Sequence, residues 1–344
     1  MFIRRKLSIS VALVLTLSLL MSLSASAREP ALGGAASFRD ANASSDSLVV
    51  DFTDATTLSH GSTYEGWLID ADDNKLSTGT LGRGPYLQGE YVSPTGDDLL
   101  ARYGTFVITV EPLDDPDPGP SGVIAYGAAT RGAVLSHIVE LVGEDGAATA
   151  LRDQAASALA YAEAAYEADS LADTQASAAM AAGMVSGIVA QARASADVAG
   201  DLLFSAASGD DENVDGTAND LIDATNNVIR LAGEMRDAAA RVAAAAGSDV
   251  ATKVETENLY LWANRLLNGT VEDSEAQGDP SSGGAIAVYE AAQDLGAFRP
   301  GVGAPPATGD SLVPMVALLA LVLGAAFVLS GGLMVFRSRR RAFA

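Results

Sequence analysis

Phe106-Val107-Ile108-Thr109-Val110-Glu111 alternates large apolar side chains with smaller or polar ones. Successive side chains of a β-strand point to opposite faces, so Phe106, Ile108 and Val110 share one face. Thr109 and Glu111 lie on the other face, as in a half-buried strand. Turn residues separate this stretch from similar short runs, which are rich in β-branched and aromatic residues and fall at 47–52, 63–69, 85–92 and 123–126. The pattern predicts that residues 47–127 form a β module, a small antiparallel sandwich or curled sheet of about five to seven strands, with Trp67, Tyr64 and Phe106 near its core.

A family resemblance covers much of this module. Tyr64-Glu65-Gly66-Trp67-Leu68-Ile69, Gly79 and Ile108-Thr109-Val110-Glu111-Pro112 resemble the extracytoplasmic domain of anti-sigma-K factors, over about residues 60–127. That family has a similar aromatic-x-x-Trp-Leu-Ile strand and a Val-Thr-Val-Glu-Pro strand that leads into a proline-rich loop. The resemblance implies an outer module of the kind that, in the family, a membrane helix tethers to a sigma-binding domain.

Beyond Arg131 the chain becomes rich in alanine and its apolar period becomes helical. One stripe contains Leu151, Ala155, Ala158, Leu159, Ala162 and Tyr166. Ser170 and Asp173 resemble a capping signal for a second helix, which has Met180, Met184 and Ile188 on one face. A third helix is expected at about 218–246, with Leu221, Val228, Leu231, Met235 and Val242 facing inward, and shorter ones at 254–267 and 285–295. Residues 128–297 are therefore predicted to form an alanine-rich bundle of about four or five helices, which makes the fold class α+β.

Both ends of the chain carry targeting signals. A basic start and the apolar run from Leu7 to Leu20 precede Ala25-Ser26-Ala27, so residues 1–27 are predicted to be a secretory signal peptide. Residues 28–46 lack periodicity and are expected to be a disordered lead-in. The uncharged apolar run 312–336 is 25 residues long, whereas about 20 residues span a bilayer as a helix. Residues 337–344 then form a basic tail, which is expected to stay cytoplasmic.

The linker at 298–311 contains a second recognisable motif. Pro306-Ala307-Thr308-Gly309, followed by an apolar span and an arginine-rich tail, resembles the cell-wall sorting signal cut by sortases. The resemblance implies cleavage between Thr308 and Gly309 and attachment to the wall, although Pro305 stands in place of the usual leucine. A sortase and the cell wall are then expected partners. The alternative is that the span remains as a permanent single membrane anchor.

The charge balance excludes some functions. The chain has a net charge of −23, and the part from Arg28 to Ser311 carries −30, because the two ends hold seven of the basic residues and no acids. Such a surface repels nucleic acids, so no nucleic-acid partner is expected. It suits divalent cations or basic partners, or it is simply a solvated coat. With no cysteine in the sequence, disulfides and thiolate zinc sites are excluded.

One acidic segment suggests calcium as a ligand. Asp211-Glu212-Asn213-Val214-Asp215-Gly216 matches the first six positions of an EF-hand-type loop, in which oxygens at positions one, three and five converge on the ion. Thr217, through its backbone carbonyl, and Asn219 would act at positions seven and nine. Position twelve is Ile222, which has no side-chain oxygen, so Asp220 or Asp223 would have to substitute there. The alternative is an acidic turn whose side chains cap the next helix.

Catalytic patterns are sparse. The sequence has two histidines, His60 and His137, and His137 lies one helical turn from Glu140. No Gly-x-Ser-x-Gly, phosphate-binding or dinucleotide motif is present. We therefore expect a non-enzymatic, surface-anchored extracytoplasmic protein for binding, sensing or structural display, with an unidentified protein or glycan as partner. The alternatives are a membrane regulator that acts through an anti-sigma-factor-like outer domain, and an enzyme on the secreted side.

Overall fold

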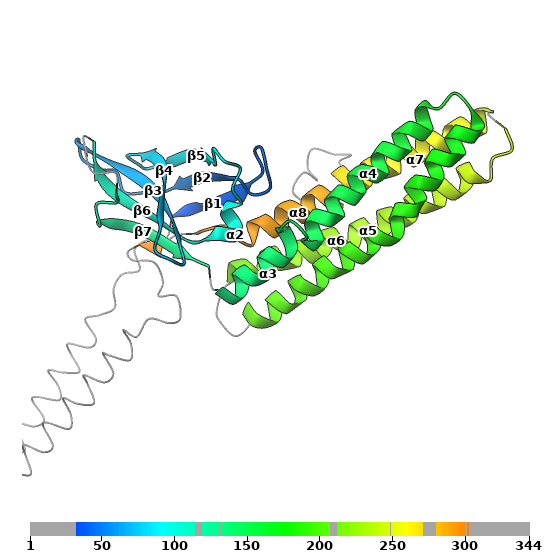
Figure 1. The fold of residues 1–344 in the computed structure, drawn as a ribbon. Coiled ribbons are helices and arrows are strands. Elements are labelled where there is room, and N and C mark those ends of the chain that lie inside the picture. The colour runs from blue at the N-terminus through cyan, green and yellow to red at the C-terminus, as the bar shows by residue number, and fades with distance from the viewer. Residues whose placement is uncertain are drawn as a thin grey trace, which may run out of the picture. The chain divides into compact units, whose positions relative to one another are not determined.

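The computed structural model describes residues 32–113, 119–130, 132–206, 212–247, 249–270, 280–299 and 301–302. These residues form two antiparallel sheets followed by a helical bundle (Figure 1), which confirms the α+β fold class. Among them, no helix has the length and apolar character that a membrane crossing requires. The expected signal peptide at 1–27, the span at 312–336 and the tail at 337–344 lie outside the described residues.

The β module contains two sheets in which every neighbouring pair of strands is antiparallel. The first sheet has the order β1-β2-β5, with β1 at Gly33–Arg39, β2 at Ser47–Thr53 and β5 at Leu87–Val92. The second has the order β4-β3-β6-β7-β8, with β4 at Lys75–Gly82, β3 at Ser62–Asp70, β6 at Tyr103–Pro112, β7 at Ile124–Ala129 and β8 at Gly301–Val302. A short helix, α2 (Leu99–Arg102), precedes β6 and is capped by Asp98, whose side chain accepts from the Ala101 N–H.

The core of the module lies between the sheets and follows the predicted alternation. Phe106 and Ile108 are fully buried, and the Phe106 ring stacks on Phe52 of the first sheet with 6.4 Å between centroids. Tyr64 also belongs to this core, as expected. Trp67 does not, because it is three positions from Tyr64 along β3 and points to the opposite face.

The bundle contains six helices within the described ranges: α3 (Gly132–Val142), α4 (Ala147–Glu167), α5 (Leu171–Ala206), α6 (Glu212–Ala243), α7 (Val250–Asn268) and α8 (Ala285–Asp294). Buried positions along α5 recur in alternating steps of four and three, at 174, 178, 181, 185, 188, 192, 195, 199 and 202. A sustained seven-residue repeat favours left-handed supercoiled packing of neighbouring helices. Many of these positions are alanine, which lets the helices approach closely. Helices α4, α5, α6 and α7 pack in a ring, each against the next.

Helix boundaries follow from local sequence signals. The Ser170 hydroxyl accepts from the Asp173 N–H at 3.1 Å and donates to the Asp173 carboxylate at 2.6 Å, which confirms the predicted capping signal. Helix α7 ends at Asn268 and is capped by Gly269, whose φ of 91° lies in the region that favours glycine. Helix α8 packs against the same two helices as α7, namely α4 and α6, so the fourth corner of the bundle is divided between α7 and α8.

The structure also differs from the sequence-based expectation in two segments of the β module and on two helix faces. Within the expected lead-in at 28–46, residues 33–39 form β1, because they pair along their whole length with β2. Within the expected linker at 298–311, Phe298 is buried in the β module and Gly301–Val302 pair with β7. Met180 and Tyr166, which were assigned to inward faces, are 53% and 54% exposed because both lie off the seven-residue repeat.

Candidate functional site

A cluster of hydrogen-bonded polar side chains lies where the end of β1 meets the helices. Asp40, directly after β1, accepts hydrogen bonds at Oδ1 from the Tyr289 hydroxyl at 2.9 Å and from Gln293 Nε2 at 2.8 Å. Its Oδ2 accepts from Arg152 Nη1 at 2.8 Å. Arg152 lies on α4, whereas Tyr289 and Gln293 lie on α8. One carboxylate therefore joins the β module to two helices; we call these four residues the Asp40 junction.

Electrostatic contacts reinforce this junction. The Arg152 guanidinium lies 4.1 Å from the centre of the Tyr289 ring, a cation–π geometry. Burial, and then the hydrogen bond to Asp40, raise the pKa of Tyr289, so its hydroxyl stays protonated as a donor at neutral pH. Burial works to lower the pKa of Arg152, but its contacts with Asp153, Tyr289 and Asp40 outweigh burial and raise it. The junction is thus a charged pair completed by two neutral donors.

The turn between β1 and β2 is shaped to present Asp40. The Ser45 N–H donates to Asp40 Oδ1 at 2.8 Å, and Ser45 has a φ of 51°. Asp46 is fully buried and accepts from the backbone N–H groups of Ala41 at 2.7 Å and Asn42 at 3.0 Å. Burial works to raise the pKa of Asp46, but these backbone hydrogen bonds outweigh it and lower the pKa. Two aspartates therefore fix this turn.

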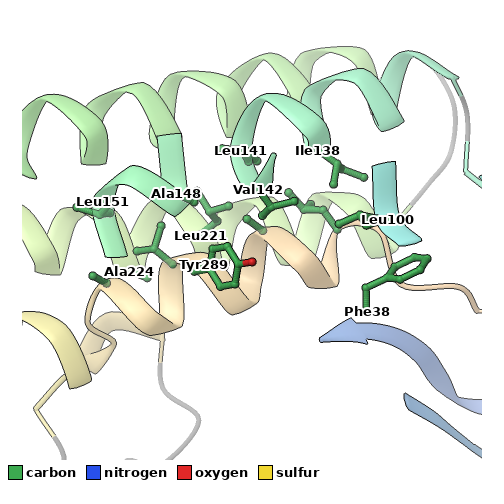
Figure 2. Packing of buried hydrophobic residues seen from close by; sticks show 14 of the residues in the cluster. Phe38, Leu100, Ile138, Leu141, Val142, Ala148, Leu151, Leu221, Ala224 and Tyr289 are labelled. Carbon is green, nitrogen blue, oxygen red and sulfur yellow. The ribbon is translucent and has the colours of Figure 1, made fainter. Parts of the chain in front are cut away.

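Apolar side chains continue the contact on the inner side of the junction. A single apolar core runs from the sheets into the helices, and Figure 2 labels part of it: Phe38 of β1, Leu100 of α2, Ile138, Leu141 and Val142 of α3, Ala148 and Leu151 of α4, Leu221 and Ala224 of α6, and Tyr289 of α8. A second ion pair, between Arg39 and Asp294 at 2.8 Å, flanks the junction. The β module and the bundle therefore share one core, and the junction is a structural joint in which Arg152, Tyr289 and Gln293 all donate to Asp40.

A second cluster lies on the outward face of β3 and β6. Trp67 is 4% exposed and donates from Nε1 to the Thr109 hydroxyl at 2.9 Å. Glu65 on the same strand accepts from the Ser77 hydroxyl. Glu111, also buried, accepts from the Ser121 N–H at 2.9 Å. The expectation of a half-exposed outer face is therefore wrong at Thr109 and Glu111, which are buried by this hydrogen-bonded cluster.

The structure places the expected calcium ligands on a helix. Helix α6 begins at Glu212, so Asn213, Asp215, Thr217 and Asn219 lie along its first turns, and Asp211 lies outside the described residues. Among the described side chains, Thr217 points about 200° away from Asp215 and from Asn219, so these three do not converge on an ion as those of a calcium loop do. Asn219 instead donates from Nδ2 to the backbone carbonyl of Asp215 at 2.7 Å. No three His, Asp or Glu side chains in the described ranges gather as a metal site.

Two further candidates from the sequence are the sorting residues and the pair His137 and Glu140. The sorting residues Pro306, Thr308 and Gly309 lie outside the described residues, so the sorting signal stays a prediction. His137 Nδ1 and Glu140 Oε2 are 3.2 Å apart on α3, where the Glu140 side chain is mostly exposed. This is a surface pair of the kind that contributes little to stability.

Sequence reasoning missed the Asp40 junction. Asp40 lies in a segment without periodicity, and its partner Gln293 is 253 positions away along the chain. No local pattern links such residues. One indirect signal is that Tyr289 and Gln293 are four apart on α8, so two polar side chains share one helix face.

The comparisons with known proteins agree with the resemblance at the β module. Residues 15–124 match the family described as anti-sigma-K factor rskA, C-terminal. The match covers under half of the chain, begins earlier than the motifs suggested, and includes β1 to β6. No curated protein and no solved structure matches. The class that fold and comparison define is thus an anti-sigma-factor-like module joined to a helical bundle; such modules are extracytoplasmic parts of membrane anti-sigma factors.

Proposed function

We propose that this chain is a surface-anchored extracytoplasmic protein that presents its β module and helical bundle together, for binding or sensing a protein or glycan. The observation that carries the proposal is the anti-sigma-K-type match over a module that shares its core with the bundle. The signal peptide expected at 1–27 and the span expected at 312–336 support the placement. The charge of −30 favours basic groups on the partner over nucleic acids.

The absence of native cysteine allows a direct test of topology. Phe204 is 86% exposed near the end of α5, so Phe204→Cys provides a single accessible thiol. We expect a membrane-impermeant maleimide to label this variant on intact cells. Ser338→Cys, in the expected cytoplasmic tail, is the matched control; in protein that keeps its tail, this thiol should react only after lysis. Labelling of Phe204→Cys only after lysis contradicts the proposal.

A second candidate is a membrane regulator, in which the outer domain controls a membrane partner. The same family match favours it, because the matched domain is known from anti-sigma factors. Purified residues 28–311 used as bait on envelope extract separate the two: recovery of one membrane regulatory protein favours regulation, and recovery of wall glycan favours display. We propose no catalysis, and an activity of the purified bait on glycans or peptides contradicts this.

A further inference from the structure

Residues 297–299 and 301–302, here called the closing segment, lie at the open edges of the two sheets. Phe298 donates its N–H to the Ala36 carbonyl and accepts from the Ala36 N–H, both at 2.9 Å. Ala36 lies on β1, whose other side pairs with β2, so Phe298 occupies the free edge of the first sheet. Three residues later β8 pairs with β7, at the edge of the second sheet. The β module is thus closed by a segment that follows the whole helical bundle in the chain.

The ring of Phe298 fills the space between the sheets. It is 2% exposed and lies 5.6 Å from the Phe38 ring in an edge-to-face arrangement. On its other side it stacks on Phe106 at 5.8 Å. Each sheet therefore contributes one aromatic partner, and aromatic pairs of this geometry stabilise beyond their buried area. Withdrawal of Phe298 removes both pairs at once.

The position of the closing segment in the chain determines what pulling on the C-terminal side does. Residues 303–311 connect it to the apolar run at 312–336, so tension from an anchor reaches β8 before any other described element. Strand β8 has only two residues and is antiparallel to β7. Upstream, α8 is held by Tyr289 and Gln293 in the Asp40 junction and by the Arg39–Asp294 ion pair. The C-terminal end of the closing segment is therefore fixed only by the two-residue pairing of β8, whereas its N-terminal end follows a helix that several side-chain contacts fix to the β module.

We infer that the closing segment is a tension-sensitive latch: a pull from the C-terminal side withdraws β8 and Phe298 and opens the β module, while α8 and the bundle stay folded. This inference rests on the proposed C-terminal anchoring. Opening uncovers Phe38 and Phe106 and leaves the edges of β1 and β7 unpaired. Free strand edges accept an added strand, so the opened module gains a surface that the closed module lacks.

Single-molecule pulling on purified residues 28–311 tests the latch. One handle is attached at Phe204, replaced by azidophenylalanine because this side chain is exposed, and the other after Ser311. We expect a reversible early lengthening of at most about 2 nm before the main unfolding, from roughly six released residues at about 3.3–3.6 Å each. Unfolding of the β module and α8 in a single event, without the early step, overturns the inference.

A disulfide lock supplies the matched control. Gly127 and Gly301 are paired in β7 and β8, so Gly127→Cys with Gly301→Cys is expected to abolish the early step under oxidising conditions and restore it after reduction. If the early lengthening persists in the oxidised variant, it comes from a part of the protein other than the closing segment, and the latch is overturned. Phe298→Leu, which keeps an apolar side chain, should lower the force of the early step without removing it; an unchanged force contradicts the role of the ring. These measurements need no cell, so a failure of the anchoring proposal is detected separately by the maleimide test.

Discussion

Arg152 and Tyr289 contact each other and donate hydrogen bonds to the same carboxylate. The Arg152 guanidinium lies 4.1 Å from the centre of the Tyr289 ring, and both side chains donate to Asp40. The aspartate comes from the turn after β1, the arginine from α4 and the tyrosine from α8. Because the three elements are far apart in sequence, this contact forms only when the β module and the bundle have both folded. The joint should therefore make their unfolding cooperative.

Comparison of Tyr289→Phe with Tyr289→Ala separates the contribution of the Tyr289 hydroxyl to stability from that of its ring. In Tyr289→Phe the ring stays under Arg152, while the hydroxyl loses its hydrogen bond to Asp40 and the one that it accepts from Gln293 Nε2. We therefore expect a loss of about 1–3 kcal/mol in the free energy of unfolding. Tyr289→Ala also removes the buried ring and should cost about 3–5 kcal/mol, the range for large aromatic deletions. Urea unfolding of residues 28–311 by circular dichroism measures both. Equal costs for the two variants contradict the assignment of the ring to the joint.

Trp67 should be essential to the β module although it lies outside the core between the sheets. It is 4% exposed, so Trp67→Ala should cost about 3–5 kcal/mol in the free energy of unfolding. The measurement belongs in residues 28–311, because the segment 47–127 alone lacks β1 and Phe298. Trp67→Phe removes the donor to the buried Thr109 hydroxyl and should cost about 1–3 kcal/mol. A negligible change in both variants contradicts the packing of this face.

Asp46 should make the β module sensitive to acid. Its pKa in the folded protein lies below the ordinary 3.8 that applies in the unfolded chain. A depressed carboxyl pKa stabilises the fold at pH values above 3.8, and this contribution is lost as the pH falls through the lower, folded value. Asp46→Asn should therefore be less stable than the parent at pH 7, with the difference shrinking in acid. Asp72→Asn, in an exposed turn, is the control; a difference independent of pH contradicts the role of the charge.

Much of the fold could be predicted because its signals are local. Alternation in β6 identified the faces of Phe106 and Ile108, and the period of buried residues identified the long helices. Strand β1 was missed because Gly33–Arg39 contains one large apolar residue, Phe38, and becomes a strand through its pairing with β2. Strand β8 was missed because Gly301–Val302 resembles a linker and is defined only by its partner strand.

For the candidate sites too, local sequence patterns predict composition but not the contacts that distant residues make. The acidic run at 211–219 has the composition of a calcium loop, but the register of α6 decides where its side chains point, and the apolar positions Leu221 and Val228 set that register. The Asp40 junction depends on contacts across more than a hundred positions, which no local pattern encodes. The family resemblance helped to predict the β module because its two motifs, at 64–69 and 108–112, lie on β3 and β6, which are adjacent in the sheet.

Thr308 tests whether the C-terminal motif is a sorting signal. If a sortase cuts after this residue, Thr308→Ala should move the protein from the wall fraction to the membrane fraction, because cleavage and wall attachment both fail. Fractionation followed by mass spectrometry of the C-terminus measures this. Thr270→Ala, in the described part of the chain, is a matched control and should leave the distribution unchanged. A parent protein that retains its arginine-rich tail contradicts sorting and favours the permanent anchor.

Calcium should bind this protein, if at all, through diffuse surface charge. Helix α6 places Thr217 on the side opposite Asp215 and Asn219, and the Asn219 amide donates to the Asp215 carbonyl, so the three side chains offer no common point for an ion. We therefore expect Asp211→Ala with Asp215→Ala to leave the calcium-binding heat per mole almost unchanged in calorimetry on residues 28–311. Diffuse binding should also weaken steeply with added salt, since exposed charges are screened. A heat of binding that vanishes in the double variant, and persists at high salt in the parent, shows instead that the segment forms a calcium loop when the ion is present.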